Sequence, residues 1–97
     1  MYKIKLLTET KSDLNIITDF IYSYTFSSEI VDNIYKDIVS GIYSLQIFPH
    51  RFKEYKNNIR VIIIRGKYKV FYGVNEESKT VTVYRIFSSL QNYENII

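Results

Sequence analysis

The chain has 97 residues, of which 46% are hydrophobic, and this is enough for one core and too little for two. It contains no cysteine, which excludes disulfides, thiolate metal sites and cysteine nucleophiles. The sequence starts without an apolar leader, and no apolar run approaches the roughly 18 residues that a membrane span needs. We therefore expect a single cytoplasmic domain over residues 1–97, with no membrane partner.

Charge is distributed unevenly along the chain. Residues 1–48 carry four lysines and six acidic residues, whereas residues 49–97 carry nine basic and four acidic residues. The imbalance is concentrated in residues 49–69, where seven lysines and arginines stand against one glutamate. This pattern predicts a surface that faces a polyanion or an acidic partner, and the alternative is an ordinary solvated face.

The first half of the chain predicts one strand and two helices. Residues 2–7 alternate apolar and basic side chains, which is typical of a strand with one solvent-exposed face. Thr10 and Asp13 have the spacing of a capping box, so we expect a first helix over residues 11–25. Its apolar stripe consists of Leu14, Ile17, Ile21 and Tyr24, widened by Ile16 and Phe20. A second helix begins at Ser27 or Ser28 and ends before Pro49, which gives an antiparallel hairpin over residues 11–47.

The second half changes to the period of strands. Residues 50–58 are polar and basic and predict a loop, and three strands are expected at residues 59–65, 68–74 and 80–87. Short connections between them indicate an antiparallel meander. The last segment, residues 90–97, fits a helical turn and an extended segment equally well. The order β-α-α-β-β-β predicts an α+β fold.

In this fold the helical hairpin must bury its apolar stripes on one face of the sheet. The other face is then expected to be exposed and to carry Lys67, Lys69 and Phe71. Strict alternation also predicts that the last strand presents four side chains on one face, namely Val81, Val83, Arg85 and Phe87.

Several ordered patterns resemble one known family. They are Asp13-Leu14-x-x-Ile17-x-x-Phe20-Ile21, Ile42-x-x-Leu45-x-x-Phe48-Pro49, Arg60 before a hydrophobic strand, Tyr68-x-Val70-x-Tyr72-x-Val74, Val81-x-Val83-x-Arg85-Ile86 and Asn92-Tyr93-Glu94. Together they cover nearly the whole chain and resemble RelE/ParE-type toxins of bacterial type II toxin–antitoxin systems, some of which stabilise plasmids.

The resemblance implies two alternative activities. RelE-like members are ribosome-dependent mRNA endoribonucleases, or mRNA interferases, whereas ParE-like members inhibit DNA gyrase; both are growth inhibitors neutralised by a cognate antitoxin. Many nuclease members have a His-x-Arg segment after the last strand, where this sequence reads Ser88-Ser89-Leu90. This departure and the long hairpin favour the ParE-like branch slightly, so whether the chain is an enzyme stays open. A non-toxic variant that only binds its antitoxin is a third alternative, and a homodimer is possible in all three.

If the chain is a nuclease, the resemblance and the chemistry of phosphoryl transfer indicate a set of candidate catalytic residues. Cations would stabilise the phosphorane and a tyrosine would act as general acid: Arg60, Arg65, Lys69, Arg85 and Tyr93. The alternatives are solubility for Lys69, pairing with a carboxylate for Arg85 and packing for Tyr93. The single histidine, His50, cannot serve as both acid and base, and we interpret it as a loop residue.

A second set of basic residues is predicted to bind a protein partner or nucleic acid, and it consists of Arg51, Lys53, Lys56 and Lys67. The sequence has no Walker loop, no Gly-rich dinucleotide fingerprint and no metal-ligand spacing. We therefore expect no cofactor and no metal. The expected partners are an antitoxin and a cellular target, either DNA gyrase or the ribosome with its mRNA.

Overall fold

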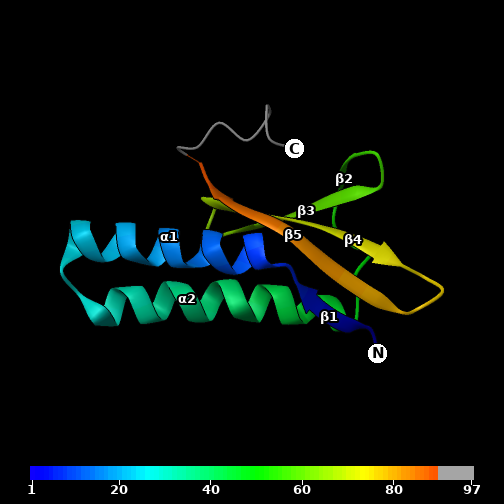
Figure 1. The fold of residues 1–97 in the computed structure, drawn as a ribbon, viewed down its shortest axis with the longest axis horizontal. Helices are drawn as coiled ribbons and strands as arrows, with labels where there is room; N and C mark the ends of the chain where they lie inside the picture. The colour runs from blue at the N-terminus through cyan, green and yellow to red at the C-terminus, as the bar shows by residue number, and fades with distance from the viewer. Residues whose placement is uncertain (90–97) are drawn as a thin grey trace.

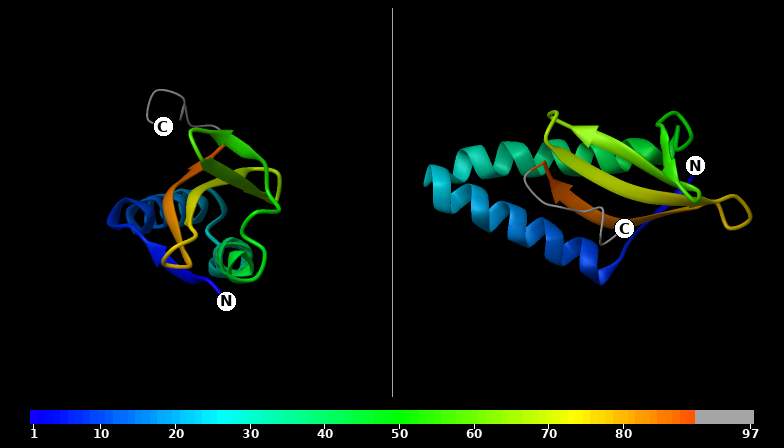
Figure 2. Two further views of the ribbon diagram at one scale, coloured as in Figure 1. Left: turned by 90° about the vertical axis from the view of Figure 1, so that its right-hand side faces the viewer. Right: turned by 90° about the horizontal axis from the view of Figure 1, so that it is seen from above.

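The computed structural model describes residues 1–89, which fold into a helical hairpin on one face of a twisted sheet (Figures 1 and 2). The elements in chain order are β1 (Lys3–Leu6), α1 (Thr8–Thr25), α2 (Ser28–Tyr43), a 3-10 turn η1 (Ser44–Gln46), β2 (Glu54–Lys56), β3 (Ile59–Ile64), β4 (Tyr68–Asn75) and β5 (Thr80–Ser88). The five strands lie in the order β1-β5-β4-β3-β2. β1 pairs with β5 in parallel, and the other neighbours are antiparallel. The predicted α+β class and the meander are confirmed.

The two helices meet in a short turn whose ends are capped in different ways. Ser27 is the N-cap of α2, and its hydroxyl accepts a hydrogen bond of 3.2 Å from the Ile30 amide. α1 ends at Thr25, and its C-cap residue, Phe26, adopts the left-handed conformation with φ of 53° and donates its amide to the Tyr22 carbonyl at 2.8 Å. These caps fix the antiparallel geometry of the hairpin.

The predicted capping box at the start of α1 is wrong. The helix begins at Thr8 rather than residue 11, and its N-cap residue, Leu7, makes no side-chain cap bond. Thr10 is buried and donates its hydroxyl to the carbonyls of Val83 and Tyr84 at 2.6 and 2.8 Å. Asp13 is buried as well and binds β5. Both side chains therefore bind residues of β5 that are distant in sequence, and the local spacing of Thr10 and Asp13 cannot predict these contacts.

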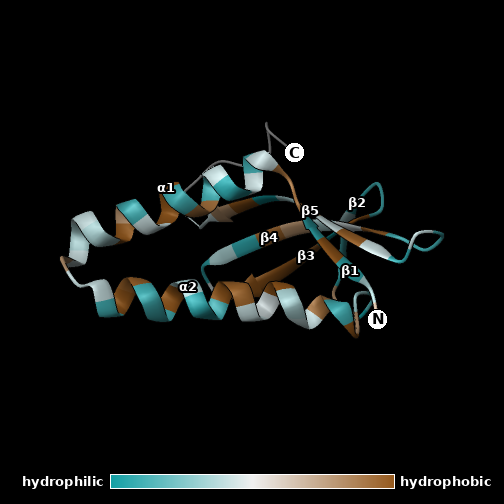
Figure 3. Cartoon of the chain, turned by 60° about the horizontal axis from the view of Figure 1, so that its bottom comes forward, coloured by the Kyte–Doolittle hydropathy of each residue, from teal (hydrophilic) through white to brown (hydrophobic). Residues whose placement is uncertain are grey.

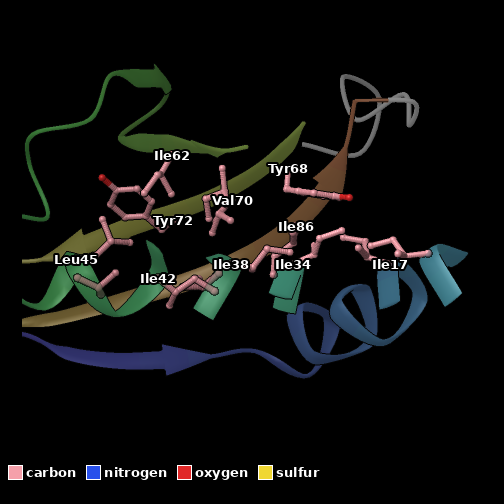
Figure 4. Packing of buried hydrophobic residues seen from close by; sticks show 14 residues of the cluster. Ile17, Ile34, Ile38, Ile42, Leu45, Ile62, Tyr68, Val70, Tyr72 and Ile86 are labelled. Atoms are coloured by element: carbon pink, nitrogen blue, oxygen red, sulfur yellow. The ribbon is translucent and has the colours of Figure 1, made fainter. Parts of the chain in front are cut away.

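The core lies between the helices and the sheet (Figure 4). Its fully buried side chains include Ile38 and Leu45 from the helical side and Val70, Tyr72 and Ile86 from the strands. α2 alternates apolar and polar bands, and β3 is apolar along most of its length (Figure 3). Gly41 allows α2 to approach β3 closely, because a Cβ there would lie 2.6 Å from Cδ1 of Ile64.

The apolar stripe of α1 is only partly confirmed. Ile17 and Ile21 are buried, but Tyr24 is 80% exposed and Phe20 is 56% exposed. The physical reason is visible in Figures 1 and 2, where the end of the hairpin that joins α1 to α2 projects beyond the sheet. The last turn of α1 extends past the strands, whereas Phe20, one turn earlier, lines a groove beside Tyr68 of β4 and stays partly exposed.

The segment 50–58, expected as a loop, contains the short edge strand β2. β2 pairs with β3 through Glu54 opposite Arg60 and Lys56 opposite Ile59. The connection is the pair Asn57 and Asn58, both with positive φ, of 48° and 65°. Asparagine tolerates this conformation, which suits a tight hairpin turn. Three polar residues were too short a run to be recognised as a strand.

A β-bulge in β5 overturns the predicted alternation of its side chains. Phe71 pairs with Arg85 and Tyr72 pairs with Val83, so Tyr84 is the extra residue. The side chains beyond it change faces: Ile86 enters the core with Val83, and Phe87 lies on the opposite face.

The outer face of the sheet is not the open surface that was expected. Phe71 and Phe87 are each only 1% exposed, and their rings meet edge-on with centroids 6.0 Å apart. Tyr55 of β2 packs against Phe71 in the same way at 5.3 Å. Lys69 is half-buried, while Lys67 is exposed as predicted. An aromatic layer therefore covers part of the face that was expected to be basic and open.

The central position of Ile38 generates a stability prediction. Ile38→Ala is expected to lower the free energy of unfolding by about 2–5 kcal/mol, because it leaves a cavity among fully packed neighbours. Ile16→Ala, on the other helix and 57% exposed, is the control and is expected to cost less than about 1 kcal/mol. Urea unfolding of both variants measures the difference, and equal losses would contradict the assigned core.

Candidate functional site

At one end of the sheet, two side chains bind the backbone of the segment before β2. Arg60 donates to the carbonyls of His50 and Phe52 at 3.2 and 2.7 Å, and the Tyr72 hydroxyl donates to the Pro49 carbonyl at 2.6 Å. Arg51 donates to the Ser44 hydroxyl at 2.9 Å. Burial raises the pKa of Tyr72 to about 12, although Arg60 and Arg51 act in the opposite direction. The phenol therefore stays neutral and remains a donor.

Arg85 and Asp13 form a two-pronged ion pair between β5 and α1. Arg85 Nε lies 2.7 Å from Asp13 Oδ2, and a terminal nitrogen of Arg85 lies 2.9 Å from Oδ1. Asp13 also accepts the Ile86 amide at 2.9 Å, beside the bulge. The hydrogen bonds to Asp13 raise the pKa of Arg85 above its already high ordinary value. The predicted alternative for Arg85, pairing with a carboxylate, is confirmed.

The remaining basic candidates lie towards the other end of β3 and β4. Arg65, with φ of 57°, binds the Asp37 carboxylate of α2 at 2.5 Å. Lys67 lines an apolar groove of about 340 Å³ together with Tyr68 and the α1 residues Ile16 and Phe20. The positive stretch 49–69 is therefore divided between two ends of the sheet.

The candidate residues for nuclease chemistry do not form one cluster within residues 1–89. Lys69 is paired in register with Phe87, and the Arg85 guanidinium lies 4.7 Å from the centre of the Phe87 ring, so these two cations are neighbours. Arg60 and Arg65 lie at opposite ends of β3, each bound as described above. Tyr93 falls outside the described residues.

The second predicted set is also divided. Arg51, Lys53 and Lys56 are exposed near β2, and Lys67 is exposed in the turn between β3 and β4. Arg51 stacks on Phe52 with its guanidinium 4.5 Å from the ring centre, and Lys56 lies 5.5 Å from the centre of the Tyr55 ring. We call Arg51, Lys53 and Lys56 the basic end of the molecule.

A cluster around Glu76 was missed by the sequence analysis. The Glu76 carboxylate accepts the Tyr2 hydroxyl at 2.9 Å and Nζ of Lys79 at 2.9 Å, and it binds Nε2 of His50. It thereby ties the start of β1, the segment before β2 and the β4–β5 hairpin together. These hydrogen bonds, that of Lys79 first, lower the pKa of Glu76 to about 2. Because Tyr2 and His50 are 74 and 26 residues from Glu76, no local pattern signals the cluster.

Two further properties concern the part of the chain that the structure describes. Residues 1–89 contain no group of three or more histidine, cysteine, aspartate or glutamate side chains that could hold a metal ion. Neither α1 nor α2 is long and apolar enough to cross a membrane.

Comparison with known families identifies the fold. The model of the family described as ParE toxin of the type II toxin–antitoxin system, parDE, matches residues 4–93. The chain belongs to this ParE toxin family. The resemblance predicted from the sequence is thereby confirmed. A search of curated protein sequences found no match.

Solved structures agree on the ParE/RelE fold. A toxin–antitoxin structure from P. aeruginosa, the chromosomal ParDE system, superposes with a TM-score of 0.76 at 20% identity, covering 91% of this chain and 96% of that one. The toxin–antitoxin complex RelBE2 from Mycobacterium tuberculosis gives 0.62 at 20% identity, with coverages of 90% and 96%. The isolated E. coli RelE toxin gives 0.60 at 14% identity, with coverages of 95% and 88%. At these identities the likeness establishes the shared fold.

The ion pair between Asp13 and Arg85 generates a second stability prediction. Asp13→Asn is expected to lower the free energy of unfolding by about 2 kcal/mol, less than the roughly 3–5 kcal/mol of a fully buried pair, because the Arg85 side chain is 28% exposed. Asp37→Asn is the matched control, since Asp37 and Arg65 are 50% and 46% exposed, and it is expected to cost at most about 1 kcal/mol. Urea unfolding measures both, and a smaller loss at Asp13 would contradict this role.

The Glu76 cluster generates a prediction about pH. Its folded pKa, near 2, lies below the ordinary value of 4.5, so the stabilisation is complete above pH 4.5 and is lost as the pH falls towards 2. Glu76→Gln is therefore expected to unfold at a lower temperature than the wild type at pH 7, and the two midpoints are expected to converge near pH 2. Thermal unfolding across this range measures the difference. Glu77→Gln is the control, and a pH-independent difference for Glu76→Gln would contradict the assignment.

Proposed function

We propose that this chain is a ParE-like toxin that stops bacterial growth by inhibiting DNA gyrase, and that a cognate antitoxin neutralises it. Membership of the ParE toxin family supports the general role. Gyrase inhibition is favoured over mRNA cleavage because most of the candidate cationic side chains are bound to partners within the protein itself.

RNA cleavage through the 2′-hydroxyl needs an acid, a base and cations that converge on one phosphate. Within residues 1–89, Arg60 binds backbone carbonyls, Arg65 binds Asp37 and Arg85 binds Asp13, at three separate places. His50 is bound to Glu76 on yet another part of the surface. Among these candidates Lys69 and Arg85 are neighbours, and the separation of the other groups is the observation that favours a toxin that acts by binding a protein.

The basic end is the part of the molecule that we assign to the antitoxin. Arg51, Lys53 and Lys56 are exposed there, next to the short edge strand β2. An acidic segment can be attracted to these cations, and an extended segment can add main-chain hydrogen bonds to an edge strand. The structures from P. aeruginosa and M. tuberculosis are described as a ParDE system and a toxin–antitoxin complex, which supports an antitoxin partner for this chain as well.

Induced expression in a bacterial host tests the proposal. Growth is expected to stop with early induction of the DNA-damage response, while protein synthesis continues at first, because inhibited gyrase damages DNA before it affects translation. Reporter induction and pulse labelling measure the order of the two events. Translation that stops first, with ribosome-dependent cuts that disappear in Lys69→Ala, would contradict the proposal and support the RelE-like endoribonuclease.

Co-expression of the small protein encoded beside the toxin provides the control, and it is expected to restore growth. Charge reversal at Arg51 and Lys53 is expected to weaken this rescue, because association between oppositely charged surfaces is then slower. Normal growth at confirmed high levels of soluble wild-type chain would contradict toxicity and leave the non-toxic antitoxin-binding variant.

A further inference from the structure

The projecting end of the helical hairpin carries a group of exposed apolar side chains that the proposed function has not used. Five side chains form this tip patch, and their exposed fractions are 56% for Phe20, 50% for Tyr22, 80% for Tyr24, 78% for Phe26 and 43% for Ile30. They lie on the last turns of α1, the connecting residue and the first turn of α2, in the part of the hairpin that extends past the sheet (Figures 1 and 2).

The tip patch is not needed to hold the hairpin together. Ile17, Ile21 and Ile34 are the buried residues that join this part of the hairpin to the core. The exposed rings pair with each other one helical turn apart, Phe20 with Tyr24 at 6.1 Å and Tyr22 with Phe26 at 6.4 Å between centroids. The two pairs start two residues apart, about 200° around the helix, so they lie on different sides of α1. Exposed aromatic side chains gathered at one end of a hairpin in this way suit a binding surface.

Phe26 provides an independent reason to assign a binding role. It adopts a left-handed backbone conformation, with φ of 53°, at the end of α1. Glycine is the usual residue at this position, because a bulky side chain is strained there. Phe26 gains little burial in return, since it is 78% exposed. An aromatic side chain therefore stands at the C-cap of α1, where the backbone conformation alone would favour glycine.

The charge around the tip patch indicates the chemistry of the partner. Residues 14–35 contain three carboxylates and no lysine or arginine, and the carboxylates of Asp19, Glu29 and Asp32 are all exposed. Lys67, which lines a groove with Phe20, adds one positive charge at the edge of the patch. An acidic surface repels nucleic acid and anionic lipid, and it complements a basic protein surface. Aromatic side chains dominate the binding energy of protein–protein interfaces, where they fill apolar pockets.

A second copy of the chain is the alternative occupant. Contact between two tips would bring like charges together, whereas contact between the tip of one copy and the basic end of another would match charges and could close an antiparallel dimer. Because the basic end is assigned above to the antitoxin, a different protein is favoured as the occupant of the tip patch.

We infer that the tip patch is the surface with which the toxin docks onto a basic, DNA-binding surface of its protein target. The inference rests on the proposed action on gyrase, since an enzyme that handles DNA must present lysines and arginines to phosphates. The aromatic side chains fill apolar pockets between these cations, and the carboxylates pair with them. Docking then competes with DNA for the same surface and weakens as salt rises.

The first experiment measures binding of the purified toxin to the gyrase holoenzyme, together with inhibition of supercoiling. The double variant Tyr24→Ser and Phe26→Gly is expected to bind at least tenfold more weakly and to lose inhibition in proportion. Its thermal midpoint is expected to stay within a few degrees of the wild-type value, and Phe26→Gly alone is expected to match or exceed that value, because glycine relieves the strained backbone. Tyr43→Ser, an exposed tyrosine on the far end of α2, is the matched control and is expected to behave as wild type.

The second experiment neutralises the carboxylates. The triple variant Asp19→Asn, Glu29→Gln and Asp32→Asn is expected to associate with gyrase more slowly and to show a weaker salt dependence. Linear DNA added as a competitor is expected to reduce wild-type binding. Binding that is insensitive to DNA would overturn the inference.

The possible results separate this inference from the proposed function. A wild-type toxin that neither binds nor inhibits gyrase would overturn the proposed function and the inference with it. Full inhibition by the tip variants would overturn the inference alone. Variants that keep inhibition but lose antitoxin binding would show that the tip patch is an antitoxin surface. Variants whose oligomeric state differs from that of the wild type would show that it is a contact between copies. Either result overturns the inference.

Discussion

The ion pair between Asp13 and Arg85 is the contact on which the arrangement of the two layers depends. It joins the first half of α1 to β5 beside the bulge at Tyr84, and Asp13 also satisfies the Ile86 amide there. Thr10 reinforces this junction through the carbonyls of Val83 and Tyr84. Because a buried carboxylate is costly without partners, the three bonds to Asp13 fix where α1 lies on β5. The direction in which the hairpin projects follows from this junction.

The molecule presents different exposed groups at its two ends, although Arg65 and Lys67 lie at the end of the sheet from which the hairpin projects. At one end, Arg60 and Tyr72 pin the segment before β2, and the exposed cations of the basic end surround it. At the other end, an acidic and aromatic helical tip extends past the sheet. The packed core around Ile38 and Ile42 lies between the two ends and keeps them apart. One small domain can therefore offer separate surfaces to two different proteins.

The parts of the fold that follow from local periodicity were predictable. The apolar spacing of α1, the serine and proline that bound the second helix, and the alternation from Tyr68 to Val74 predicted the hairpin and the meander, because each pattern needs only its own segment. Thr10 and Asp13 were misinterpreted because a capping box and a tertiary contact use the same residue types. The bulge at Tyr84 was missed because Phe87 continues the alternation of Val81 and Val83, which concealed the shift that places Ile86 in the core.

The candidate site was predictable to a smaller extent, for a related physical reason. Arg85 could be assigned a carboxylate partner because a lone charge among valines is costly, but nothing in the sequence identified that partner as Asp13. The groups around Glu76 come together only through the pairing of β1 with β5 and of β4 with β5. Phe20 and Tyr24 of α1 were wrongly assigned to the buried stripe, because the helical spacing alone does not indicate where the sheet ends.

The parallel pairing of β1 with β5 also determines when the protein can take its final form during synthesis. Lys3 lies opposite Thr80, so β1 can pair with its partner only after residues 80–83 have been made. β5 lies between β1 and β4 in the sheet, and Arg85 of β5 anchors α1 through Asp13. Neither β1 nor α1 can therefore reach its native position before residues 80–88 have left the ribosome. Such long-range pairing is slow to form compared with a local hairpin. Until residues 80–88 are available, β1 and α1 lack the strand that anchors them, and the native arrangement of the two layers cannot form.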